Sequence, residues 1–183
     1  MKTLIIVAHP NISKSVINKR FIEELRKYPE TYTVHELTSA YPDGIIDVEQ
    51  EQKLVEAHDH LVLQFPIQWF SCPPILKTWL DEVLTQGWAY GRNGGDKLQG
   101  KKVALAVTAG IRKSDYLESG RYHYTLEQLL TPFETTFRYY CRADYRSFFA
   151  FYGAEIVPGE EYSSSSEEIE QGVKDYLEFL DKL

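Results

Sequence analysis

Three short segments of the 183-residue chain combine residue types that suit an anion or a planar ring. Each follows an apolar run, and they begin at His9, Pro66 and Thr108. The first is rich in hydroxyl and amide groups, the second carries two adjacent aromatic rings, and the third is small and ends in a glycine. Together they predict a site for a phosphorylated ligand with a flat ring system.

The first segment has the composition of a phosphate-binding loop. A helix is expected to begin between Ser15 and Asn18, and the first turn of a helix presents unpaired amides and a positive dipole end. Ser15 also fits a simple N-cap without any ligand, so this segment is a weak signal by itself. Further donors and positive charges come from His9, Ser13, Lys14, Lys19 and Arg20.

The other two segments suit the ring. Trp69 and Phe70 follow a buried run and cannot both be strand core, so in a loop held by prolines they offer a flat apolar wall. The alternative is that both pack under the helix that follows. Thr108, Ala109 and Gly110 permit close approach of backbone to ligand, although a strand-to-helix turn often needs a glycine in any case.

Strands and helices must alternate to position these loops. The apolar first run is rich in β-branched residues, as in a parallel strand buried on both faces. Ile17, Phe21 and Leu25 repeat at a spacing of four and predict a helix that Pro29 ends. Strands are expected at 3–8, 32–37, 60–65, 102–108 and 147–152, and further helices at 48–57, 73–83, 126–140 and from the serine run 163–166 to the chain end.

This alternation predicts an α/β fold of three layers, with an open, doubly wound parallel sheet. The specific expectation is a flavodoxin-like five-stranded sheet of order 2-1-3-4-5 in a single domain spanning residues 1–183. Ligands of such sheets bind beyond the carboxyl ends of the strands, where the strand order reverses. That is where the three segments meet.

Composition narrows the class of protein. A formal net charge of -7 disfavours a nucleic-acid partner. Cys72 and Cys141 are expected to be reduced thiols, and the first apolar run is too short for a membrane span, so we expect a cytoplasmic location. The first loop carries neither a G-x-G-x-x-G dinucleotide fingerprint nor a Walker-type G-x-x-x-x-G-K, and no metal site is expected.

Four motifs resemble one family. They are AHP-x(4)-S-x-x-N at 8–18, FPIQWFSCPPILKTWLDEVL at 65–84, GWAYG at 87–91 and VTAG at 107–110. These resemble the flavodoxin-like NAD(P)H:quinone oxidoreductases, and within them the bacterial ancillary flavoproteins of potassium efflux systems and the general-stress quinone reductases. The resemblance covers nearly the whole chain.

The resemblance implies a role for each matching position. The flavin phosphate and ribityl chain fall on His9, Ser15, Val16, Ile17 and Asn18. Pro66, Ile67, Gln68, Trp69 and Phe70 flank the isoalloxazine, and Thr108, Ala109 and Gly110 lie along its pyrimidine edge. Trp88 and Tyr90 face the substrate pocket, and Tyr116 and His123 act near the flavin in catalysis.

The implied activity is transfer of a hydride from NADPH or NADH through bound FMN or FAD to a quinone-like acceptor, in one two-electron step. The same scaffold also suits an azo- or nitroreductase. A different class is a flavin-binding regulatory subunit of a membrane transporter for potassium efflux. A plain electron-transfer flavodoxin fits less well, because it needs no organic-substrate pocket.

A homodimer with its active sites at the subunit interface is also expected. The family suggests it, and so do the many large rings between Pro132 and Tyr152, some of which should be exposed in a monomer. The alternative is that these rings only cover one end of the sheet.

Overall fold

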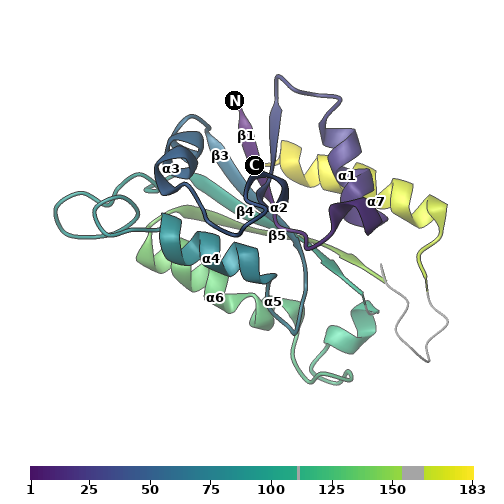
Figure 1. Ribbon diagram of the computed structural model, residues 1–183. Helices are drawn as coiled ribbons and strands as arrows, with labels where there is room; N and C mark the ends of the chain where they lie inside the picture. The colour runs from purple at the N-terminus through teal and green to yellow at the C-terminus, as the bar shows by residue number, and fades with distance from the viewer. Residues whose placement is uncertain (111, 154–162) are drawn as a thin grey trace.

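The computed structural model describes residues 1–110, 112–153 and 163–183. Its centre is an all-parallel sheet of five strands in the order β2-β1-β3-β4-β5 (Figure 1). The strands are β1 (Thr3–Val7), β2 (Tyr32–Glu36), β3 (His60–Pro66), β4 (Lys102–Ala109) and β5 (Asp144–Tyr152). This is the predicted flavodoxin-like order, in which the strand order reverses between β1 and β3.

Helices cover both faces of the sheet (Figure 1). One face carries α1 (Ile17–Leu25) and α7 (Ser166–Asp181). The other carries α3 (Val48–Glu56), α4 (Pro74–Val83), α5 (Leu126–Leu129) and α6 (Thr131–Glu134). Short segments η1 (Ile12–Lys14), α2 (Leu37–Ala40) and η2 (Lys113–Tyr116) follow β1, β2 and β4. Among the described residues, no helix combines the length and the apolar character that crossing a membrane requires.

The core lies in two layers, one on each side of the sheet. Leu4 and Ile6 of β1 face the layer under α3 and α4, whereas Ile5 and Val7 face the layer under α1 and α7. Alternate residues of the same strand are therefore buried on opposite faces, which is why the strand is continuously apolar in sequence.

The stretch 126–140 is not the single helix that was expected. It is divided into α5, α6 and a π-helical segment, η3 (Thr135–Tyr140). Pro132 lies in the first turn of α6, where its missing amide hydrogen costs no helical hydrogen bond, so the chain starts a new helix there. β5 also begins earlier than expected, at Asp144 rather than Ser147.

The aromatic segment 132–152 is mostly covered. Phe133 and Phe137 are buried in the layer beneath α4, and the rings that are largely exposed are Tyr139 (70%) and Tyr140 (61%). Exposure of some rings is thus confirmed. Because most of them pack against the sheet, aromatic crowding alone is a weaker argument for a dimer than the sequence indicated. Both Cys72 and Cys141 are free thiols, and burial raises their pKa.

Candidate ligand-binding site

The segments that follow β1, β3 and β4 meet at the carboxyl edge of the sheet. Asn18 Nδ2 donates a hydrogen bond to Thr108 Oγ1 (2.9 Å), and the Ile67 amide donates to the Thr108 carbonyl oxygen (2.8 Å). From α2, Thr38 Oγ1 donates to the His9 carbonyl oxygen (2.8 Å). The loops are therefore fixed to one another by hydrogen bonds.

A cavity of about 230 Å³ opens where these segments meet. It lies at the start of α1 and at the ends of β3 and β4, beside the point where the strand order reverses. Its lining residues are His9, Asn11, Lys14, Ser15, Val16, Ile17, Asn18, Pro66 and Thr108. All of these except Asn11 and Lys14 are among the cofactor-binding residues that the resemblance implies.

The cavity presents hydrogen-bond donors and positive charge. Ser15 Oγ accepts the amide hydrogen of Asn18 (3.1 Å), as a helix N-cap does. The amides of Val16 and Ile17 have no partner within α1, because the first turn of a helix has no preceding carbonyls to bond. Lys14 adds a cation to the lining. This donor set suits a phosphate group.

Trp69 and Phe70 form the tip of a tight turn after β3. The amides and carbonyls of Gln68 and Ser71 exchange two hydrogen bonds, of 3.1 and 2.9 Å. Both central residues have positive φ, +47° at Trp69 and +61° at Phe70, a conformation that favours glycine or asparagine and costs roughly 1–2 kcal/mol per residue. Strain of this kind is found at functional sites.

The two rings of this turn do not pack under α4. The Trp69 side chain is 94% exposed and Phe70 is 39% exposed, so the packing alternative is wrong. The tip of the turn instead supplies an aromatic surface beside the cavity, whose lining includes Pro66 just before the turn. Its contact with a cofactor ring stays a prediction.

A row of aromatic rings joins this turn to the end of β5. The Phe70 ring lies 4.8 Å from that of Tyr122, which lies 5.5 Å from Tyr116, and Tyr116 lies 5.9 Å from Tyr152. Burial raises the pKa of Tyr116 to about 12, so its phenol is neutral and able to donate near neutral pH. Tyr116 thus reaches the turn indirectly, because the Tyr122 ring lies between it and Phe70. Tyr122 was not among the residues that the sequence predicted for the site.

Ala109 and Gly110 of the third segment, and His123, do not line the cavity. Ala109 is fully buried as the last residue of β4, and Gly110, just beyond it, is partly buried. His123 occupies a left-handed position (φ +59°), is exposed and does not line the cavity. Its catalytic role stays a prediction.

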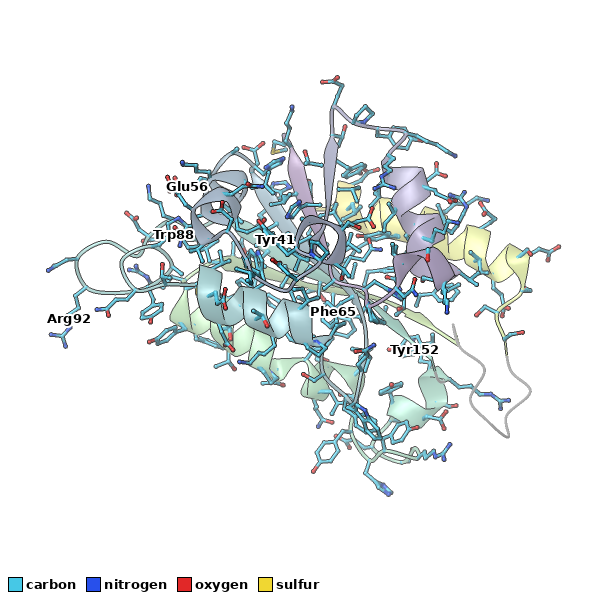
Figure 2. The ribbon with its side chains drawn as sticks, viewed as in Figure 1. Tyr41, Glu56, Phe65, Trp88, Arg92 and Tyr152 are labelled. Carbon is cyan, nitrogen blue, oxygen red and sulfur yellow. The ribbon has the colours of Figure 1, made fainter. Side chains whose placement is uncertain are left out.

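Trp88 and Tyr90 are not brought to the cavity. Trp88 is 7% exposed, and its Nε1 donates to Glu56 Oε1 (2.7 Å). Figure 2 shows this pair at the opposite end of the molecule from Tyr152, whose strand partner is Ala109. Tyr90 packs on Tyr140, with 4.8 Å between ring centroids. Neither residue lines the cavity of its own chain, and a contribution of either to a substrate pocket stays a prediction.

Comparison with known proteins agrees with this geometry. Residues 1–180 match the model of a protein family whose members have a flavodoxin-like fold. The chain belongs to this flavodoxin-like family. It is 44% identical, over 92% of its length and 95% of the relative, to the Bacillus subtilis protein named uncharacterized NAD(P)H oxidoreductase YrkL. It is 36% identical to the glutathione-regulated potassium-efflux system ancillary protein KefG of Cronobacter sakazakii, over 96% of this chain and 94% of that protein.

Solved structures of other flavodoxin-like proteins superpose along the whole chain. General stress protein 14 of Treponema denticola, in complex with FMN, has a TM-score of 0.90 and 49% identity, and the match covers 100% of this chain and 99% of that one. An NADPH-quinone reductase from P. pentosaceus has a TM-score of 0.83 and 27% identity, covering 98% and 97%.

Proposed function

We propose that this chain is an NAD(P)H-dependent flavoprotein oxidoreductase that binds FMN non-covalently at the start of α1 and reduces a quinone-like acceptor. The observation that carries the proposal is the cavity at the reversal of the strand order, with helix amides, Ser15 and Lys14 in its lining. The FMN complex of the Treponema denticola relative and the names of the other relatives support it.

The residues present fit such a cofactor. The amides of Val16 and Ile17, with Ser15 and Lys14, form a donor set for the phosphate. The turn at Trp69 and the backbone after Thr108 would flank the ring system. When bound, a flavin takes a hydride from a reduced nicotinamide and gives it to an organic acceptor.

The chain's own part in this reaction is orientation, exclusion of water and charge stabilisation. The strained Trp69–Phe70 turn offers an apolar wall on which a planar acceptor or a nicotinamide can stack. Tyr116 keeps its proton near neutral pH because burial raises its pKa, and it can donate a hydrogen bond where negative charge develops. No nucleophile is required.

The proposal predicts that the purified, flavin-free protein takes up FMN and then oxidises NADPH or NADH over many turnovers when a quinone such as menadione is supplied. Quenching of flavin fluorescence measures binding, and absorbance of the reduced nicotinamide measures turnover. Failure of both FMN and FAD to bind would remove the proposed function. Binding without turnover would instead favour the second candidate.

That second candidate is a flavin-binding regulatory subunit of a potassium efflux transporter. It rests on the 36% identity to the KefG protein across almost the full length of both chains. Quinone turnover by the purified chain, with no membrane partner present, distinguishes a free-standing enzyme from such a subunit.

We further propose that the active protein is a homodimer in which each substrate pocket is completed by the other chain. The exposed Trp69 and the exposed Tyr139 and Tyr140 are large rings in contact with water in a single chain. Trp88 and Tyr90 do not line the cavity of their own chain, so a second chain would have to bring them to it. Closure by a second chain would also exclude water from the site.

Mixing two inactive variants tests the shared pocket. Trp69→Ala and Tyr90→Ala homodimers are each expected to lose most of their quinone turnover. After subunit exchange, half of the dimers are heterodimers of the two variants. Each heterodimer has one site with the intact Trp69 of one chain and the intact Tyr90 of the other, and one site with neither. About a quarter of all sites is then intact, so turnover returns to about a quarter of the wild-type value. A monomeric mass in light scattering at micromolar concentration, or mixing that restores nothing, would contradict the shared site.

A further inference from the structure

Four buried polar side chains form a chain of hydrogen bonds from the cavity to the buried face of α7. Tyr176 OH donates to Gln64 Oε1 (3.1 Å), Gln64 Nε2 donates to Asn18 Oδ1 (3.2 Å), and Asn18 Nδ2 donates to Thr108 Oγ1. The four residues are between 0% and 4% exposed. We call Tyr176, Gln64, Asn18 and Thr108 the buried relay. Its other end, Tyr176, does not line the cavity, whereas Asn18 and Thr108 do.

The direction of the hydrogen bonds in the relay is fixed at Gln64. A buried phenol needs an acceptor for its hydrogen, and burial raises the pKa of Tyr176 so that it keeps this hydrogen. On the other side, Gln64 Nε2 also lies 3.4 Å from the Asn18 carbonyl oxygen, which can only accept. Both neighbours therefore place the oxygen of Gln64 toward α7 and its NH₂ group toward Asn18.

That direction passes on to Thr108. Because Asn18 Oδ1 accepts from Gln64, the Asn18 NH₂ group must face Thr108 and donate to its hydroxyl oxygen. The hydroxyl hydrogen of Thr108 is then left to donate elsewhere, and among the described residues no acceptor for it is seen. Since Thr108 lines the cavity, this hydrogen is available to a ligand there.

We propose that Gln64 and Tyr176 are positioning residues that hold Thr108 as a hydrogen-bond donor to an oxygen of the bound phosphorylated ligand. The proposal rests on the proposed function, because it assumes that the cavity holds FMN. Without the relay, the Thr108 hydroxyl is free to turn its hydrogen toward Asn18 and to present its lone pairs to the ligand, which a ligand oxygen that can only accept a hydrogen bond disfavours.

A double-mutant cycle in FMN affinity tests the relay. The variants are Tyr176→Phe, Thr108→Val and the combination, titrated with FMN after removal of flavin. Each single change is expected to weaken FMN binding about fivefold, the equivalent of one net hydrogen bond. In the double variant the loss stays about fivefold, since Tyr176 acts only through Thr108. Thr108→Ser keeps the hydroxyl and is expected to bind FMN more tightly than Thr108→Val.

The controls separate positioning from packing. Tyr32→Phe removes another buried phenol, whose OH lies 3.4 Å from Asp181 Oδ1 of α7. This change is expected to leave FMN affinity unchanged. Gln64→Met interrupts the relay at similar volume and is a second route should Tyr176→Phe not fold. Urea unfolding of the flavin-free variants records the structural cost separately from the binding cost.

Three outcomes have distinct meanings. Non-additive losses with rescue by Thr108→Ser support the relay. If Tyr176→Phe causes the same loss in the wild-type chain and in the Thr108→Val variant, or no loss at all, the relay is overturned and the proposed function stands. Wild-type protein that binds no FMN overturns both.

Discussion

Replacing Glu51 by alanine is expected to lower the free energy of unfolding by about 3–5 kcal/mol. Glu51 lies on α3 and is completely buried. Its Oε1 accepts from His35 Nε2 (2.7 Å) and Tyr41 OH (2.7 Å), and its Oε2 accepts from Trp79 Nε1 (2.8 Å). One carboxylate on α3 thus binds side chains from β2, from α4 and from Tyr41, which directly follows α2. Its removal leaves three donors without their acceptor.

Urea unfolding monitored by circular dichroism measures this loss. Glu49→Ala is the matched control, because Glu49 lies on the same helix but is exposed and pairs with Lys53. The control should change the free energy of unfolding by less than about 1 kcal/mol. Equal effects of the two substitutions would show that the buried hydrogen bonds contribute nothing.

The same carboxylate predicts how stability depends on pH. Burial by itself raises the pKa of Glu51, but the hydrogen bonds from His35, Tyr41 and Trp79 outweigh it and leave the pKa below the ordinary value of 4.5. A lowered pKa gives stability that is present above pH 4.5 and is lost as the pH falls through the folded-state pKa. The stability difference between the wild type and Glu51→Gln should therefore shrink below pH 4.5.

Riboflavin, which lacks the phosphate, is expected to bind at least about 100-fold more weakly than FMN. Hydrogen bonds to a charged group contribute about 1.5–3 kcal/mol each, and the start of α1 offers at least two amides as well as Ser15 and Lys14. Parallel fluorescence titrations of the flavin-free protein with the two compounds measure the ratio.

Single substitutions show whether the phosphate lies at this cavity. Lys14→Ala should weaken FMN binding and leave riboflavin binding unchanged, so the ratio narrows. Lys27→Ala is the control, because Lys27 lies beyond the other end of α1 and pairs with Glu24 (2.8 Å). If Lys14→Ala leaves the ratio unchanged, the phosphate is held elsewhere, and equal binding of FMN and riboflavin to the wild type would mean that the phosphate adds nothing to affinity.

Much of the fold could be predicted because periodicity reports burial. The continuous apolar runs of β1 and β3 follow from cover on both faces, and the alternation with helices leaves few topologies. Glu51 escaped prediction because a glutamate in a charged helical stretch is normally on the solvent face. The interruption at Pro132 was missed because a proline that starts a new helix leaves the apolar spacing intact.

The site could be predicted in part for the same reason. The strand order places the loops at 9–18, 66–70 and 108–110 on one edge, and the cavity is found there. Tyr122 was missed because its contact with Phe70 depends on the path of an irregular segment. Trp88 and Tyr90 carry a motif of the family, but a motif does not say where the fold places its residues, and neither residue lines the cavity.

The turn at Trp69 and Phe70 also sets a limit on redesign of this protein. A procedure that chooses residues for this backbone alone would place Asn-Gly at the tip, since both positions have positive φ. The redesigned chain would tolerate more heat and would have lost its flat aromatic wall. Engineering for thermal resistance therefore has to hold these two positions fixed and seek its gains at positions away from the candidate site.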